Sequence, residues 1–127
     1  MSKPPIVVRS DTSIIDASKI MSDKGVGSLM IIDDRGILIG IVTERDIIHS
    51  LARGYACRES RVKDIMSRNL IVAREDEDLD KAIERMREMN IRHLPVIDDQ
   101  GKPVGMISMR DILDIAGNLL KLIIEHH

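Results

Sequence analysis

The stretch GIVTERDI at residues 40–47 returns in similar form as GMISMRDI at residues 105–112. In both, a short apolar run ends in a hydroxyl residue, and an Arg-Asp pair follows. A shift of 65 residues brings the two stretches together and aligns the two halves of the chain without a gap. Two copies are too few for a solenoid, so the sequence predicts two similar units related by a pseudo-twofold axis. The same shift aligns residues 6–11 with 71–76, 16–21 with 81–86, and 27–36 with 92–101.

Each copy predicts the element order β-α-β-β-α. A short extended piece, residues 6–9 or 70–74, is followed by a helix whose apolar residues recur with the spacing of a buried stripe. Two strands come next, and the links between them, DDRG at 33–36 and DDQG at 98–101, have the composition of hairpin turns. The candidate helix caps in the first copy are Asp11, Thr12 and Ser13, and the stripe in the second copy is Leu79, Ala82, Ile83 and Met86.

A second helix closes each copy and begins at the repeated Arg-Asp pair. In the second copy it extends from Asp111 to about Glu125. We expect the copies to bury their apolar faces against each other, because so small a sheet cannot cover both of its faces. The sequence therefore predicts an α/β (α+β) fold in which two β-α-β-β-α units form one compact domain with clefts between them. The predicted units are residues 1–54 and 69–127, joined by residues 55–68.

Composition excludes several classes of protein. Hydrophobic residues make up 43% of the 127 residues, but the chain has no Trp or Phe and one Tyr, so base stacking on aromatic rings is not expected. The net charge of −2, with mixed signs, argues against binding to nucleic acid or a membrane surface. No apolar run has the roughly 20 residues of a membrane span. The single Cys57 excludes an internal disulfide and favours a cytoplasmic protein, and His126 and His127 are either native or the remnant of a purification tag.

The repeated segments resemble the cystathionine β-synthase (CBS) domain, and the tandem pair is similar to a Bateman module. The resemblance rests on GSLMIIDDRGILIGIVTERDII at 27–48, VKDIMSRN at 62–69 and IRHLPVIDDQGKPVGMISMRDIL at 91–113. It implies a regulatory module that binds an adenosine-containing ligand (AMP, ADP, ATP, S-adenosylmethionine or NAD) and forms a homodimer. Since the chain has no room for an attached enzyme, it resembles a free-standing prokaryotic pair that acts on an unidentified partner protein. No catalytic cofactor is expected.

The repeated turn carries the predicted ligand-binding residues. Thr43 and Asp46 match the family pattern G-h-x-[T/S]-x-x-D, and so do Ser108 and Asp111. The resemblance implies that the Asp holds the ribose hydroxyls and that the Thr or Ser contacts ribose or phosphate. The chemistry agrees, because a carboxylate can accept hydrogen bonds from a vicinal diol but is a poor partner for phosphate. Thr-x-x-Asp at a helix start is also typical of a capping box, and the two roles can coexist.

Phosphate requires cations, which related modules often take from the residues just before the L-P-V strand of the opposite copy. Those residues are Arg92 and His93 in the second copy, and Gly27 and Ser28 in the first. We therefore expect two unequal clefts, of which the first favours a phosphorylated ligand and the second has less charge to offer. Alternatively, Arg92 is a solvated surface side chain and His93 is structural. The first cleft would combine Thr43, Asp46, Arg92 and His93, and the second Ser108, Asp111, Gly27 and Ser28.

The adenine is expected to lie between aliphatic walls, because the chain is so poor in aromatic residues. The candidate wall residues are Val42, Ile107, Val8 and Val72, each of which is alternatively plain core. Weaker candidates for the cations are Arg45, Arg110 and Lys102. Hairpin turns explain the acidic pairs at 33–34 and 98–99 better than a metal site does, so no metal is expected.

These features favour a regulatory sensor of adenosyl ligands that acts through dimer geometry or a partner protein. The alternative is an interaction or dimerisation module whose clefts hold no nucleotide. Nucleic-acid binding is less favoured on charge. The sequence contains no constellation of base, nucleophile and orienting group, so we do not expect an enzyme.

Overall fold

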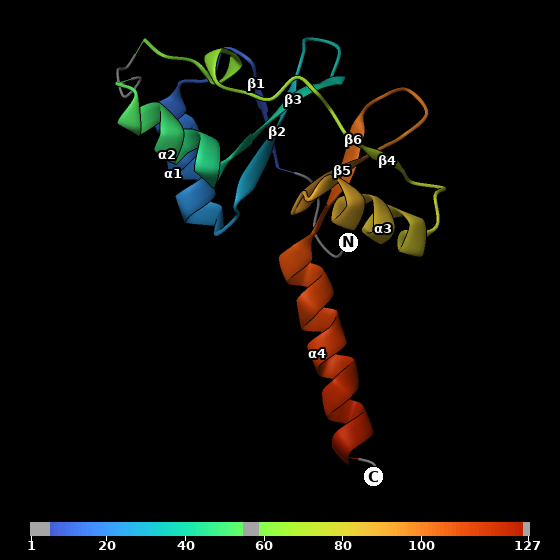
Figure 1. The fold of residues 1–127 in the computed structure, drawn as a ribbon. Coiled ribbons are helices and arrows are strands. Elements are labelled where there is room, and N and C mark those ends of the chain that lie inside the picture. Colours follow the sequence, from blue (N-terminus) through green and yellow to red (C-terminus); the bar gives the residue numbers. More distant parts are fainter. Residues whose placement is uncertain (1–5, 55–58, 126–127) are drawn as a thin grey trace.

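Each half of the repeat folds around its own three-stranded sheet, in the strand orders β1-β2-β3 and β4-β5-β6. The first two strands of each sheet run parallel and the last two antiparallel, so the predicted β-α-β-β-α order and the α/β fold are confirmed (Figure 1). The computed structural model describes residues 6–54 and 59–125. The elements of the first half are β1 (Val7–Arg9), α1 (Ile14–Lys24), β2 (Ser28–Ile32), β3 (Leu38–Thr43) and α2 (Glu44–Ala52). A 3-10 turn, η1 (Val62–Asp64), leads to β4 (Ala73–Arg74), α3 (Leu79–Met89), β5 (His93–Ile97), β6 (Pro103–Ser108) and α4 (Met109–Glu125).

The strand register repeats as closely as the sequence does. Ser28 pairs with Thr43 in the first sheet, and His93 pairs with Ser108, at the equivalent positions, in the second. Each pair lies where a hairpin ends and the following helix begins. The register therefore places the hydroxyl residues Thr43 and Ser108 directly beside the residues that open β2 and β5.

Local side-chain chemistry sets the ends of the helices and hairpins. Among the three predicted caps, Ser13 is the N-cap of α1, and its Oγ accepts a hydrogen bond from the Asp16 N–H at 3.0 Å. Asp33 Oδ1 and Asp98 Oδ1 each accept two backbone N–H groups across their hairpins, at distances of 2.9 and 3.0 Å. The acidic pairs are therefore turn residues, and the described part of the chain contains no cluster suited to a metal ion.

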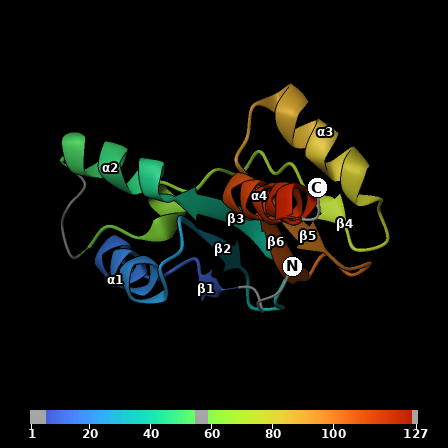
Figure 2. The same ribbon diagram turned by 90° about the horizontal axis from the view of Figure 1, so that it is seen from below.

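The apolar core is divided between the two motifs rather than shared. The first cluster of buried residues lies between the first sheet, α1 and α2, and the second between the second sheet and α3. One face of each sheet is covered by helices of its own motif (Figure 2). Met30 and Pro95, at equivalent positions of β2 and β5, are buried outside both clusters, which agrees with the expectation that the copies also bury apolar faces against each other. The sheets meet at their hairpins, where the Leu38 N–H donates to the Gly101 carbonyl at 3.0 Å.

The segment between the motifs contributes to the first core. Val62 and Met66 are buried in the first cluster, and the Ser67 N–H donates to the Ile41 carbonyl of β3 at 2.9 Å. Gly40 permits this close approach, because a Cβ on it would lie 2.9 Å from Met66 Cγ. The sequence analysis treated residues 55–68 as a connecting segment, although VKDIMSRN at 62–69 carried part of the family resemblance. Cys57, His126 and His127 lie outside the described residues.

Helix α4 projects away from the two motifs (Figure 1). The predicted tail helix is confirmed, and it begins at Met109. Ile112 packs partly against the second cluster, whereas every residue from 113 to 125 is exposed. No helix in the described residues is long and apolar enough to cross a membrane.

Candidate ligand-binding clefts

Two cavities lie between the motifs, on either side of the point where β2 and β5 begin. The larger, of about 1250 Å³, is lined by Asp111 and is called the Asp111 cavity. The smaller, of about 850 Å³, is lined by Asp46 and is called the Asp46 cavity. Both repeated acidic residues therefore border a hollow to which the two motifs contribute.

The Asp46 cavity brings together the residues predicted for the first cleft. Thr43, Arg45 and Asp46 come from the junction of β3 and α2, while Arg92 and His93 come from the start of β5. These five residues thus contribute a carboxylate, a hydroxyl, two guanidinium groups and an imidazole to one hollow. Such a set can hydrogen-bond a sugar and neutralise an anion.

Asp46 also closes a capping box with Thr43. Its Oδ2 accepts hydrogen bonds from the Thr43 N–H at 2.9 Å and from the Thr43 hydroxyl at 3.1 Å. The Asp46 N–H donates in return to Thr43 Oγ1 at 3.3 Å. Capping and cavity lining therefore coexist, because one oxygen of Asp46 takes part in the cap while Oδ1 has no hydrogen bond to another described residue.

The Asp111 cavity brings together the second predicted set. Ser108 and Asp111 line it from the junction of β6 and α4, and Gly27 and Ser28 line it where β2 begins. The Asp111 N–H donates to Ser108 Oγ at 3.1 Å, but the Asp111 carboxylate makes no return bond to a described residue. Arg110 also lines this cavity. The two motif junctions are therefore equivalent in position but unequal in their hydrogen bonding.

Arg92 and His93 line both cavities, not only the one predicted from the sequence. His93 is half-buried, and its Nδ1 lies 3.3 Å from Ser28 Oγ. Burial lowers the pKa of His93 below 6.5, opposed by the nearby carboxylate of Glu44 and reinforced by Arg92. The imidazole is therefore neutral at neutral pH and serves as a hydrogen-bonding group rather than as a cation.

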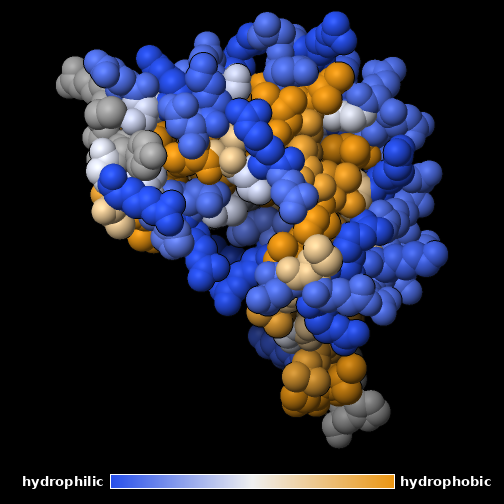
Figure 3. All heavy atoms as spheres, turned by 45° about the horizontal axis from the view of Figure 1, so that its top comes forward, coloured by the Kyte–Doolittle hydropathy of each residue, from blue (hydrophilic) through white to orange (hydrophobic). Residues whose placement is uncertain are grey.

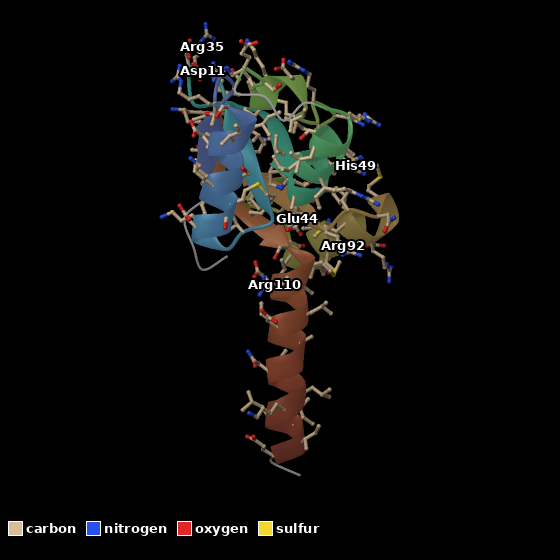
Figure 4. The ribbon with its side chains drawn as sticks, turned by 90° about the vertical axis from the view of Figure 1, so that its left-hand side faces the viewer. Asp11, Arg35, Glu44, His49, Arg92 and Arg110 are labelled. Atoms are coloured by element: carbon tan, nitrogen blue, oxygen red, sulfur yellow. The ribbon has the colours of Figure 1, made fainter. Side chains whose placement is uncertain are left out.

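Glu44 is a cavity residue that the sequence analysis missed. It lines both hollows, and its Oε1 lies 3.5 Å from the position that a Cβ on Gly27 would occupy, beside the His93 ring. Its N–H donates to the Gly27 carbonyl at 2.9 Å. The equivalent residue in the second motif is Met109, whose N–H donates to the Arg92 carbonyl at 2.8 Å. The repeats differ here, because a charged residue in the first motif replaces an apolar residue in the second. This difference was the signal that could have revealed Glu44. Figure 4 shows Glu44, Arg92 and Arg110 near the base of α4, far from Asp11 and Arg35.

The structure places the four predicted wall residues away from the cavity lining. Val42 and Val8 are buried in the first core cluster, and Ile107 packs against the second. The described lining instead includes the neighbours Ile41 and Met106. Successive side chains of a strand point to opposite faces, so a one-residue error in phase exchanges wall and core. The fourth, Val72, is also absent from the described lining, while its neighbour in sequence, Ile71, lines the Asp46 cavity. Lys102, a weaker cation candidate, lines neither cavity in the described part of the chain.

The sequence profile of the CBS domain family matches residues 1–53 and 62–118. The chain belongs to the CBS domain family. Its two motifs form a CBS pair, as the resemblance of the repeats implied. The CBS domain pair of protein MJ0100, solved in complex with 5′-methylthioadenosine and S-adenosyl-L-methionine, is 38% identical with a TM-score of 0.85. That likeness covers 93% of this chain and 92% of the other. A conserved protein from Pyrococcus horikoshii is 34% identical with a TM-score of 0.80, over 91% and 87% of the two chains.

Some relatives are enzymes, but this CBS pair matches only part of them. An L-aspartate semialdehyde sulfurtransferase of Methanocaldococcus jannaschii is 38% identical over 117 residues, which are 92% of this chain and 22% of the relative. Protein MK0525 of Methanopyrus kandleri is 37% identical over 117 residues, which are 91% of this chain and 59% of the relative. The chain thus spans about a fifth of the sulfurtransferase and less than two thirds of the second relative.

Proposed function

We propose that this CBS pair is a regulatory module that binds adenosine-containing ligands in the two cavities between its motifs. The placement of Asp46 and Asp111 carries the proposal, because each lines a shared cavity at the start of a helix, close to residues of the other motif. Carboxylates suit ribose hydroxyls, helix starts and guanidinium groups suit an anion, and aliphatic walls suit adenine. The adenosyl ligands in the MJ0100 pair support this choice of ligand class.

Within each cavity we assign the ribose to the acidic residue. Asp46 offers its Oδ1, and Asp111 offers both carboxylate oxygens, since no described residue bonds to them. Thr43 and Ser108 hold their helix starts and present a hydroxyl beside the sugar. Ile41 and Met106 are the apolar residues that we expect to contact the adenine, in place of their neighbours on the strands.

Isothermal titration calorimetry with AMP, ATP, S-adenosylmethionine and 5′-methylthioadenosine tests this proposal. Asp46→Asn and Asp111→Asn should each weaken binding in one cavity by about tenfold or more, because a neutral amide is a poorer acceptor for two ribose hydroxyls. Asp80→Asn on α3, exposed and outside both described linings, is the matched control and should bind as the native protein does. Absence of binding by all four ligands at millimolar concentration would contradict the proposal.

We also propose that the protein forms a homodimer through α4. Seven apolar side chains of this helix are each 52–68% exposed: Leu113, Ile115, Leu119, Leu120, Leu122, Ile123 and Ile124. They lie on one broad face of α4, and Figure 3 shows apolar atoms at its projecting end. A helical stretch this short is marginally stable in water without tertiary contacts, so a partner surface is expected to cover it.

A second copy of the chain suits this face better than a membrane does. At roughly 100 Å² per side chain the face exposes on the order of 700 Å² of apolar surface, close to the ~800 Å² that each partner of a stable interface buries. Membrane-surface helices carry a basic polar face, whereas α4 has three acidic and two basic residues. Because α4 starts inside the Asp111 cavity lining, ligand binding there can alter dimer geometry and signal to a partner protein.

Analytical ultracentrifugation tests the dimer. Leu119→Glu with Ile123→Glu should shift the protein to monomer, while Lys121→Glu, on the polar side of the same helix, should leave the dimer intact. A dimer that persists with both glutamates present would contradict the α4 interface. Dimerisation without any adenosyl binding would favour the second candidate, an interaction module with empty cavities, which the exposed α4 face also supports.

A further inference from the structure

The two cavities share a wall. Among the described residues, four line both of them: Glu44, Ile48, Arg92 and His93. Arg92 directly precedes β5, His93 opens it, and Glu44 opens α2 beside Gly27. The two cavities therefore lie on either side of the same few charged groups.

The charges of this wall are not duplicated by the repeat. Each cavity has an arginine of its own at the equivalent position, Arg45 in one and Arg110 in the other. Arg92 has no such counterpart, because the equivalent residue in the first motif is Gly27. In the described lining, the Arg92 guanidinium group is thus shared by the two cavities, and each cavity has one further guanidinium group, from Arg45 or Arg110.

His93 does not supply the missing cation. Its ring is half-buried against Ser28, and burial lowers its pKa, so the imidazole is neutral at neutral pH. Glu44, on the same wall, contributes a negative charge to both cavities. The shared wall therefore carries one positive group and one negative group, which leaves a single strong partner for phosphate.

The remaining charges differ between the cavities. The described lining of the Asp46 cavity holds two carboxylates, from Glu44 and Asp46, and two guanidinium groups. That of the Asp111 cavity holds three carboxylates, because Asp114 joins Glu44 and Asp111, and again two guanidinium groups. An anion is therefore better accommodated in the Asp46 cavity, and a neutral or positively charged ligand in the Asp111 cavity.

We propose that the two cavities compete for Arg92, so that one chain holds one phosphorylated adenosyl ligand, in the Asp46 cavity, together with one uncharged or cationic adenosyl ligand in the Asp111 cavity. This inference rests on the proposed function and adds the rule by which ligands combine. It makes the pair responsive to two metabolites at once: a phosphorylated ligand weakens binding of a second phosphorylated ligand, while an unphosphorylated one is still accepted.

Calorimetry with AMP and with 5′-methylthioadenosine, which lacks a phosphate, separates the two ligand classes. We expect 5′-methylthioadenosine to fill both cavities of a chain. AMP should bind once tightly and a second time at least about tenfold more weakly, since only one of the two phosphates can add Arg92 to the arginine of its own cavity. Titrating 5′-methylthioadenosine into the AMP-saturated protein should give one further site without displacement of the first AMP.

Arg92→Gln provides the decisive variant. It should weaken the first AMP site by about tenfold and bring the two AMP affinities together, while 5′-methylthioadenosine binds as before. Arg87→Gln, on the exposed surface of α3 and outside both described linings, is the matched control and should retain the native difference between the two AMP affinities. Two AMP molecules bound with equal affinity by the native protein would overturn the competition but leave the proposed function standing. So would a difference between the two AMP affinities that is unchanged in Arg92→Gln. Failure of both ligands to bind would overturn both.

Discussion

Gly40→Ala should destabilise the protein, although glycine inside a strand is normally a weak point. A Cβ at this position would lie 2.9 Å from Met66 Cγ and 3.2 Å from Met66 Cβ, well inside the ~3.5–4.0 Å of an ordinary carbon contact. Met66 is 8% exposed, and its N–H donates to the Val62 carbonyl at 2.8 Å. Ser67 is tied to Ile41 of the same strand, so the segment cannot simply move away.

The size of the effect follows from two opposing contributions. Overpacking a filled core costs about 1–3 kcal/mol, and replacing glycine by alanine returns about 0.4–1 kcal/mol through the entropy of the unfolded chain. We therefore expect Gly40→Ala to lower the free energy of unfolding by about 1–2 kcal/mol. Urea denaturation followed by circular dichroism measures this as a lower midpoint with an unchanged m value.

A double-mutant cycle with Met66→Ala tests the assigned cause. Met66→Ala alone should cost about 2–5 kcal/mol, because it leaves a cavity in the first core. In that background the added methyl group of Gly40→Ala has space and should be neutral or stabilising, giving a coupling of at least about 1 kcal/mol. If the two changes are simply additive, the contact with Met66 is not the reason for glycine at this position.

Three further changes have outcomes of defined sign. Gly117→Ala, at an open position of α4, should raise helix content and stabilise the protein by about 0.5–1 kcal/mol, because nothing lies within 4 Å of the new Cβ and alanine is the better helix former; a loss of stability in thermal denaturation would contradict this. The pKa of His93 is lowered by burial, so the unfolded state binds more protons and stability should fall as the pH drops below 6.5; His93→Gln should flatten that part of the pH–stability profile. The pKa of Glu77 is lowered from 4.5 by its hydrogen bonds with Arg85, so this contribution is present above pH 4.5 and lost below it. Glu77→Gln should cost on the order of 0.5–1 kcal/mol at pH 7 and nothing at pH 2, measured by urea denaturation at both pH values.

The repeat made much of the fold predictable. Turn residues such as Asp33 and Asp98 act through hydrogen bonds to residues a few positions away, so their patterns are visible locally. The apolar stripes of the helices pack against distant strands, but their spacing can be read within one stretch of sequence. The sets that line each cavity were predictable for a related reason. Two equivalent motifs that meet must bring Asp46 near the start of β5 and Asp111 near the start of β2.

The errors arose where the answer depends on the direction of a side chain or on distant segments. Wall residues were predicted one position out of phase, since Ile41 and Val42 are equally apolar and only the packing decides which faces the core. The segment at 55–68 was predicted only as a linker, because no apolar periodicity within it marks Val62 and Met66 as core residues. Glu44 was missed because its importance comes from a neighbour, His93, in the other motif.

By itself, the sequence determined the β-α-β-β-α order of each motif, the hairpin turns, the family and the acidic residues at the two helix starts. These depend on hydrogen bonds and periodicities that operate within one copy of the repeat. Only the tertiary structure decided that each motif keeps its own core, that α4 stands exposed, and that Arg92, His93 and Glu44 form a wall common to both cavities. The physical reason is that such a wall exists only where side chains from two separately folded motifs meet, and no pattern within either copy records their separation in space.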